Sequence, residues 1–283
     1  MRVYLIGAGP GDPGLLTCKG REILARADVI IYDYLAAEEL LANARPDAER
    51  IYVGKIAGNH AMKQDDINKL LVRKAKEGKC VARLKGGDPY IFGRGGEEAL
   101  ELYEAGVPFE VVPGVTSAIA APCYAGIPLT HRAFSSSLTI ITGHEDPAKA
   151  NSAHDWNALA KSGSTLVILM GMKNLPEITA RLLQAGMPGD TPSALVNWGT
   201  TLHQRSLVTT LQDLPAAAVA RFQGNPPPVG LKLHDGIPAG AVAAGGIAAD
   251  AGYRGIGQLQ IAAVHPDGVF VAAGRFNAFA FDF

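Results

Sequence analysis

Short runs of apolar, β-branched residues alternate with stretches of helical spacing over the first part of the chain. The runs predict strands at residues 3–6, 29–32, 50–53, 81–84 and 109–112. Helical spacing lies between them at residues 15–27, 64–77 and 96–105. Strands that alternate with helices are typical of a parallel α/β sheet. We therefore predict one α/β sheet from this part of the chain.

A second cycle of the same kind begins after a break at Pro113 and Gly114. Its strands are expected at residues 138–142, 166–169, 193–197 and 206–210. Its helices are expected at residues 115–125, 156–161, 175–185 and 211–221. The pattern predicts an N-terminal α/β domain over residues 1–114 and a C-terminal α/β domain over residues 115–222.

Residues 223–283 do not continue this pattern. They hold 11 of the 33 glycines together with 13 alanines, and they contain an Asn-Pro-Pro-Pro run at 225–228. Three successive prolines cannot form a helix interior or a central strand. We expect an atypical Gly/Ala-rich tail that is mobile or disordered. Short β-like pieces at 259–264 and 269–272 offer an alternative.

The composition narrows the class of protein. The chain has 283 residues, of which 48% are hydrophobic and 19% charged, as in globular proteins. A net charge of −1 argues against a general nucleic-acid binder. Three cysteines and scattered histidines without ligand spacing predict neither a disulfide framework nor a metal site. Because no apolar run is long enough to span a membrane and no signal peptide is recognisable, we expect a soluble cytoplasmic protein.

Two glycine-rich turns follow predicted strands. The first, at residues 7–12, resembles a dinucleotide-binding loop, but Asp12 stands where the third glycine is needed and Pro10 lacks an N–H for a pyrophosphate. A phosphate-binding loop is therefore disfavoured. A tight turn with no ligand is as well supported as a ligand-binding role. The second turn is Lys85-Gly86-Gly87-Asp88-Pro89, continued by Ile91 to Glu98. Adjacent glycines let a ligand approach the backbone, and Asp88 offers an acceptor, so this turn predicts a ligand site.

Two smaller features are also candidates. Thr116 and Ser117 begin a predicted helix, where their hydroxyls either cap the helix or bind a ligand carboxylate. Asp33 ends the predicted strand at 29–32, where a cap or turn is the alternative to a functional role. The serines at 135–137 lack the G-x-S-x-G context of a nucleophile elbow.

Six strings occur in order along the chain. They are GAGPGDPGLLT at 7–17, ADVIIYD at 27–33, VGKIAGNH at 53–60, RLKGGDPYIFGRGGEE at 83–98, VVPGVTSAIAAPCYAGIPLTHR at 111–132 and ITGHE at 141–145. In order and wording they resemble the tetrapyrrole (class III) methyltransferases, from residue 2 to about residue 221. The resemblance implies two α/β domains with S-adenosylmethionine in the cleft between them, and a homodimer.

The activity implied by the resemblance is two methyl transfers to uroporphyrinogen III, at C2 and C7. The product would be precorrin-2, on the route to sirohaem and cobalamin. The implied cofactor contacts are Pro10, Gly86, Gly87, Asp88, Ile91, Thr116, Ser117, Met170 and Gly199. Asp33 matches the family's proposed proton acceptor and Lys55 its proposed donor. The substrate carries many carboxylates, so we expect cationic partners beside the motifs, at Lys55, His60, Arg94, His131 and Arg132.

Two alternatives stay open. The same fold serves later precorrin methyltransferases and diphthine synthase, although GRGGEE and IPLTHR favour the first step. The other alternative is a protein that binds the cofactor or a tetrapyrrole without turnover. It arises because the family ends in two apolar strands that residues 223–283 do not reproduce. A change of reading frame near residue 222 would account for the departure, and strands at 259–264 and 269–272 could replace those that are missing.

Overall fold

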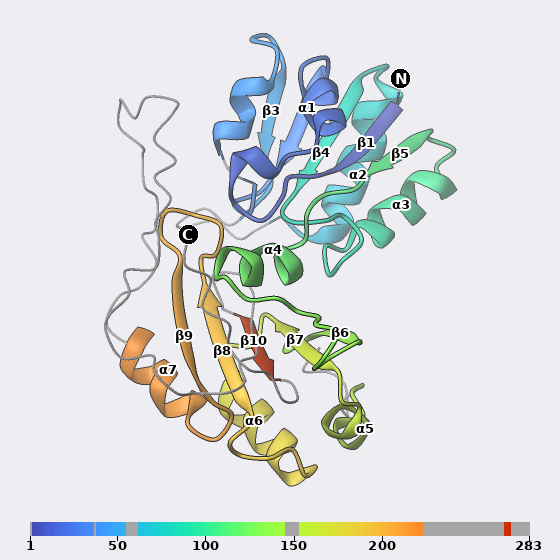
Figure 1. The fold of residues 1–283 in the computed structure, drawn as a ribbon. Helices are drawn as coiled ribbons and strands as arrows, with labels where there is room; N and C mark the ends of the chain where they lie inside the picture. Colours follow the sequence, from blue (N-terminus) through green and yellow to red (C-terminus); the bar gives the residue numbers. More distant parts are fainter. Residues whose placement is uncertain (1, 37, 55–61, 145–152, 223–268, 273–283) are drawn as a thin grey trace.

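The structure is a computed structural model that describes residues 2–36, 38–54, 62–144, 153–222 and 269–272. Its strands form two five-stranded sheets, with α4 (Ser117–Tyr124) between them (Figure 1). Helices pack on both sheets, which confirms the predicted α/β class.

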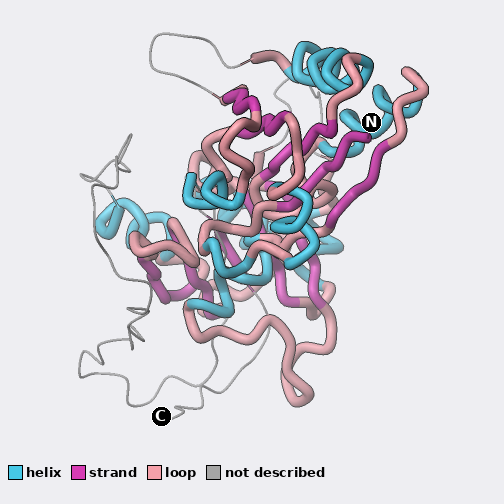
Figure 2. The backbone as a smooth tube through the Cα atoms, turned by 90° about the horizontal axis from the view of Figure 1, so that it is seen from above, coloured by secondary structure: helices cyan, strands magenta, loops and turns pink. Residues whose placement is uncertain are grey.

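The first sheet is entirely parallel, with the strand order β3-β2-β4-β1-β5. Its strands are β1 (Arg2–Gly7), β2 (Val29–Tyr32), β3 (Glu49–Tyr52), β4 (Cys80–Lys85) and β5 (Phe109–Val112). Seen from above, they run side by side, with the N-terminus at the end of one of them (Figure 2). Both faces are covered by helices, so the strands appear in the sequence as continuous apolar runs.

This sheet separates two clusters of buried apolar residues, one on each face, and helices cover both. On one face, Tyr4 and Ile6 of β1 pack with α1 (Cys18–Leu24) and the 3₁₀ segment η2 (Glu38–Asn43). On the other, Val3 and Leu5 pack with α2 (Gln64–Lys76) and α3 (Gly95–Glu104). The helix predicted over 15–27 is shorter in the structure. A separate 3₁₀ turn, η1 (Pro13–Leu15), precedes it, and Thr17 caps α1 by accepting a hydrogen bond from Gly20 N at 3.1 Å.

The second sheet is mixed, with the order β6-β7-β10-β8-β9. Its strands are β6 (Leu138–Thr142), β7 (Thr165–Leu169), β8 (Pro192–Asn197), β9 (Arg205–Thr210) and β10 (Val269–Ala272). Ala118 and Ala121 of α4 pack on one face. The opposite face packs against α5 (Trp156–Lys161), α6 (Leu175–Gln184) and α7 (Leu214–Phe222).

One piece of the atypical C-terminal segment belongs to this sheet. Val269–Ala272 lies between β7 and β8 and pairs antiparallel with both. Without it, the facing edges of two buried strands would keep unpaired N–H and C=O groups, which is costly. Of the two strands suggested as replacements, 269–272 takes the central position, and 259–264 lies outside the described residues.

Candidate functional site

The carboxyl edge of the first sheet gathers most of the candidate residues. Because all five strands are parallel, the loops that follow them emerge at the same edge. The glycine turn follows β1, Asp33 follows β2, residues 86–94 follow β4 and residues 113–117 follow β5. The strand order brings these four loops into neighbouring positions.

Four glycines allow the loops to touch through their backbones. Gly9 N donates to Gly87 O at 3.2 Å, and Gly87 N donates to Gly9 O at 2.7 Å. A Cβ atom on Gly7 would lie 2.4 Å from the Cα of Gly114, and one on Gly114 would lie 2.2 Å from Gly87 O. Since no side chain fits between them, the close packing of these loops requires glycine at Gly7 and Gly114.

Asp88 ties two of these loops together. Its Oδ1 accepts hydrogen bonds from Tyr90 N at 2.8 Å and Ile91 N at 3.2 Å, and its Oδ2 accepts from Gly114 N at 3.0 Å. The predicted acceptor for a ligand is therefore largely occupied by the backbone. The carboxylate sets the shape of the ligand loop beside the predicted contacts Gly86 and Gly87.

Asp33 is held by a turn and by an ion pair. Its Oδ1 accepts from Leu35 N at 3.0 Å. This bond forms the turn that was expected for Asp33 as the alternative to a functional role. Its Oδ2 accepts from Arg83 Nη2 at 3.0 Å, and the Asp33 side chain stays 19% exposed. The turn presses Leu35 against Gly86, where an added Cβ atom would lie 2.5 Å from Leu35 Cβ. Asp33 is thus fixed beside the ligand loop with part of its carboxylate in reach of solvent.

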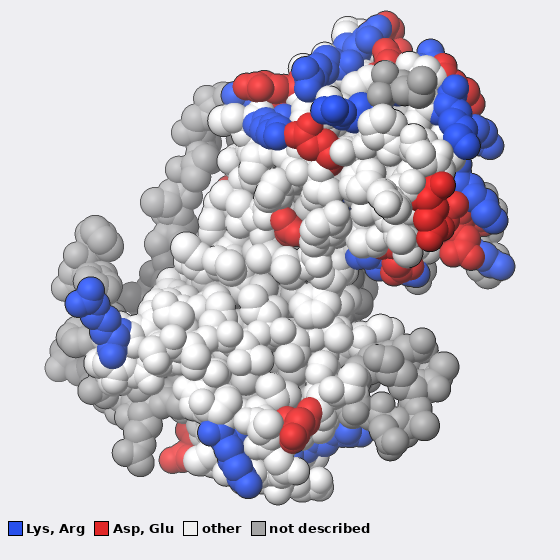
Figure 3. Space-filling view, turned by 90° about the vertical axis from the view of Figure 1, so that its right-hand side faces the viewer, with Lys and Arg blue, Asp and Glu red and all other residues white. Residues whose placement is uncertain are grey.

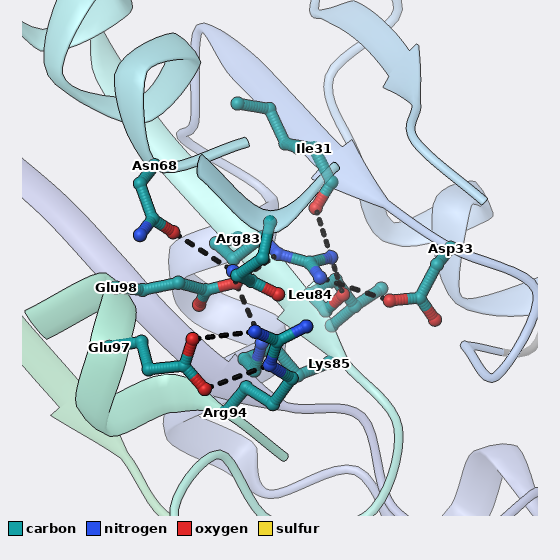
Figure 4. Close-up of polar contacts among 10 residues, drawn as sticks. Ile31, Asp33, Asn68, Arg83, Leu84, Lys85, Arg94, Glu97 and Glu98 are labelled. Carbon is teal, nitrogen blue, oxygen red and sulfur yellow. Dashed lines mark hydrogen bonds and ion pairs between the residues drawn. The ribbon is translucent and has the colours of Figure 1, made fainter. Parts of the chain in front are cut away.

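A buried charge cluster, formed by Arg83, Lys85 and Glu98, lies beside Asp33 and reaches it through Arg83 (Figure 4). Glu98 Oε1 accepts from Arg83 Nε at 3.1 Å, Lys85 Nζ at 2.7 Å and Gln64 Nε2 at 3.2 Å. The side chain of Glu98 is 0% exposed and those of the two cations 3% and 5%. Burial lowers the pKa of Lys85, and the neighbouring Arg83 lowers it further, while Glu98 opposes both effects.

The second sheet presents a matching edge. β7 and β8 point the same way because both are antiparallel to β10. Met170 follows β7 with φ +59°, and Gly199 follows β8 between Trp198 at φ +52° and Thr200 at φ +64°. Non-glycine residues seldom adopt these angles, and such strain concentrates at ligand sites and clamps. Both predicted cofactor positions of this half therefore stand in constrained turns at one edge.

The two edges touch at the predicted cofactor positions. Asp12 N donates to Thr200 Oγ1 at 3.1 Å, and a Cβ atom on Gly11 would lie 2.6 Å from Thr201 Cγ2. These contacts bring the turn that holds Pro10 against the turn that holds Gly199. At the start of α4, Thr116 Oγ1 accepts from Ala118 N at 3.3 Å, and the backbone of Thr116 and Ser117 lies beside Gly87.

The predicted cationic residues are not gathered in the same way. Arg94 forms a bidentate pair with Glu97 at 2.8 and 2.7 Å, which raises the pKa of Arg94 and lowers that of Glu97. His131 bridges to Ser135 and stacks on Phe134, and Arg132 is exposed beside it. Lys55 and His60 lie outside the described residues.

Charge is distributed unevenly between the two halves. Charged side chains crowd the surface over the first sheet and are sparse over the second on the face shown in Figure 3. A near-zero net charge therefore conceals a charged half and a mostly neutral half. Over the described residues, no group of three or more His, Cys, Asp or Glu could hold a metal ion. No helix within these ranges is long and apolar enough to cross a membrane.

Four residues of the site were given no role from the sequence. Arg83 and Lys85 flank Leu84 on a buried strand, and Glu98 stands in the first turn of α3. The signal was present, because charged residues at alternate positions of an apolar strand need a buried partner. Tyr124 was also missed: its hydroxyl donates to Asp12 Oδ2 at 2.6 Å, which raises the pKa of Tyr124 to about 12. No local pattern indicated that contact, which spans 112 positions of the chain.

Comparison with known proteins gives a consistent result. Residues 2–215 match the family described as Tetrapyrrole (Corrin/Porphyrin) Methylases. An S-adenosyl-L-methionine-dependent uroporphyrinogen III methyltransferase from Methanosarcina barkeri is 54% identical over 220 residues, which cover 78% of this chain and 86% of that one.

Two solved structures are also similar. One is a uroporphyrin-III C-methyltransferase from Thermus thermophilus complexed with S-adenosyl homocysteine. It is 33% identical, with a TM-score of 0.68 over 96% of this chain and 97% of that one. A cobalt precorrin-4 methyltransferase is 31% identical, with a TM-score of 0.69 over 77% of this chain and 89% of that one. The family match ends at residue 215, ahead of the atypical C-terminal segment.

Proposed function

Because the chain belongs to the tetrapyrrole (corrin/porphyrin) methylase family, we propose that it methylates uroporphyrinogen III with S-adenosylmethionine, at C2 and C7, to give precorrin-2. One observation carries this proposal. The positions that the family resemblance assigns to the cofactor converge, from loops far apart in the sequence, on two edges that touch each other. A binding module without chemistry would not need Asp33 fixed beside that edge.

The cofactor supplies a methyl group activated by a positively charged sulfonium. The bare backbone of Gly86 and Gly87 suits a flat ligand that approaches closely, and Ile91 beside them is exposed. Pro10 and Gly199 stand in the two turns that touch each other, and Met170 stands in the turn after β7. Thr116 and Ser117 stand at the N-terminus of α4, where its dipole favours a carboxylate. These residues bind and orient, which is the main need of a transfer that must run in line.

Asp33 acts on the substrate. Methylation of a pyrrole carbon leaves a proton to remove, and a fixed, partly exposed carboxylate is a suitable base. The Arg83 ion pair and the Leu35 turn fix both oxygens, so the base has one orientation. Lys55 is the proposed donor. His60, Arg94, His131 and Arg132 would pair with the substrate carboxylates, and Arg94 would have to exchange its bond to Glu97 for one to the substrate.

Two alternatives are less well supported. Later precorrin methyltransferases share the fold, but the relative that is 54% identical over 220 residues is a uroporphyrinogen III methyltransferase. Binding without turnover was motivated by an incomplete second sheet. In the structure β10 fills the centre of that sheet in place of one of the two strands, which weakens this motive. The proposal includes a homodimer, taken from the family resemblance, and a location in the cytoplasm, expected from the sequence. Light scattering tests the dimer.

The test uses purified chain, uroporphyrinogen III and S-adenosylmethionine labelled in the methyl group. We expect two labelled methyl groups on each tetrapyrrole. Label found only when a precorrin replaces uroporphyrinogen III would point to a later step of the pathway. Cofactor binding with no transfer to any tetrapyrrole would contradict enzymatic function.

A further inference from the structure

A closed ring of hydrogen bonds links the two halves of the molecule next to the proposed cofactor site. Tyr124 Oη donates to Asp12 Oδ2 at 2.6 Å, and Gln204 Nε2 donates to Tyr124 O at 3.1 Å. Thr200 N donates to Gln204 Oε1 at 2.7 Å, and Asp12 N donates to Thr200 Oγ1 at 3.1 Å. We call these four residues the cross-sheet ring.

The ring joins three separate segments. Asp12 belongs to the glycine turn after β1, Tyr124 is the last residue of α4, and Thr200 and Gln204 lie in the connection from β8 to β9. Asp12 is also fixed on its own side, since its Oδ1 accepts from Gly14 N at 2.7 Å. Thr200 is 7% exposed and held at φ +64°. The ring thus connects two constrained turns through one helix end.

The position of the ring determines its effect. Pro10 lies two residues before Asp12, and Gly199 directly precedes Thr200. Gly11, with φ +147°, has no room for a side chain because a Cβ atom would lie 2.6 Å from Thr201 Cγ2. The contact of Gly11 with Thr201, which the ring holds together, therefore sets the distance between the turn of Pro10 and the turn of Gly199. Its bond between a phenol and a carboxylate is charge-assisted, the stronger kind.

We propose that the cross-sheet ring is a latch that holds the glycine turn and the turn of Gly199 at the separation required for S-adenosylmethionine, with Tyr124 and Thr200 as positioning residues. This inference rests on the proposed function. The latch does not touch the reacting atoms. Opening it lowers the fraction of molecules that can bind the cofactor, and the apparent dissociation constant rises by the inverse of that fraction.

The test compares Tyr124→Phe and Thr200→Val with the wild-type chain, using calorimetry with S-adenosylmethionine and steady-state methyl transfer. Each variant removes one hydroxyl. We expect the dissociation constant and the KM for S-adenosylmethionine to rise about tenfold, as when one molecule in ten remains latched. The kcat at saturating cofactor should stay within about twofold of wild type, since chemistry in the latched state is unchanged. Tyr103→Phe is the control, because Tyr103 is 76% exposed on α3.

The double variant separates a latch from two independent contacts. Either substitution opens the same ring, so the double variant should bind little worse than either single variant. Thr200→Ser keeps a hydroxyl and should restore binding. The proposal would be overturned if the single variants bound S-adenosylmethionine as tightly as the Tyr103→Phe control. It would also be overturned if the double variant bound roughly a hundredfold more weakly than wild type. If the wild-type chain binds no S-adenosylmethionine, the proposed function fails and the latch with it. If wild type binds and both variants bind equally well, only the latch fails.

Discussion

Glu98 and Glu97 are adjacent acidic residues in the first turn of α3, and they provide a matched pair of substitutions. Glu98 is 0% exposed and receives three hydrogen bonds on Oε1, two of them from buried cations. Glu97 is 50% exposed and pairs only with Arg94, itself 58% exposed, among its described ion pairs. Each residue changed to glutamine loses the same kind of charge from the same helix end, so the helix dipole contributes similarly to both.

The expected magnitudes differ several-fold. Glu98→Gln leaves Arg83 and Lys85 buried with only Asp33 as a carboxylate partner. Removing one partner of a buried ion pair costs about 3–5 kcal/mol, because the remaining charge is uncompensated. Glu97→Gln breaks an exposed pair, worth about 0.2–1 kcal/mol. Gln64 cannot supply the missing charge, since its amide is neutral.

Urea denaturation followed by circular dichroism measures the difference. With a slope of about 2–3 kcal/mol per molar urea, the Glu98→Gln midpoint should fall by about 1–2.5 M relative to wild type. The Glu97→Gln midpoint should shift by no more than a few tenths of that. Equal shifts in the two variants would refute the assignment of Arg83, Lys85 and Glu98 as a buried, mutually dependent cluster.

Three further outcomes follow from individual contacts. Asp88→Ala removes an acceptor for three backbone N–H groups, so cofactor affinity should fall about tenfold, as for about 1.4 kcal/mol; an unchanged dissociation constant by calorimetry would count against it. Gly114→Ala places a Cβ atom 2.2 Å from a carbonyl oxygen and should destabilise the fold by about 1–3 kcal/mol, whereas Gly96→Ala, with nothing within 4 Å, should not. Burial, together with Asp28, raises the pKa of the Cys80 thiol. At pH 8 a disulfide reagent should therefore label the exposed Cys18 and Cys123 first and Cys80 last, and the difference in rate should narrow as the pH rises. Equal labelling rates for the three cysteines would contradict this.

The strands and the ligand loops were accessible to sequence reasoning because their signals are local. Short apolar runs identify β1, β2, β4 and β5 to within a residue at each end. Consecutive glycines identify the loop at Gly86 and Gly87, since backbone contact there excludes side chains.

The remaining features depend on contacts between distant segments. β10 is four residues long and enters the second sheet from a Gly/Ala-rich segment, where β-like runs alone do not distinguish a central strand from a loop. The partner of Asp33 is 50 positions away at Arg83, and the partner of Tyr124 is 112 positions away. Arg94 was expected to be available to a substrate, but it also lies three residues from Glu97, an ion-pair spacing on a helix.

Asp33→Asn gives the most direct test that the carboxyl edge of the first sheet is the site of methyl transfer. Asparagine keeps an oxygen for the Leu35 turn but cannot act as a base at neutral pH. We expect the variant to bind S-adenosylmethionine with the wild-type dissociation constant, measured by calorimetry. We also expect labelled methyl groups to reach uroporphyrinogen III about 10²–10⁴ times more slowly than with wild type. Transfer at the wild-type rate would remove Asp33 from the mechanism and show that methyl transfer does not depend on this carboxylate.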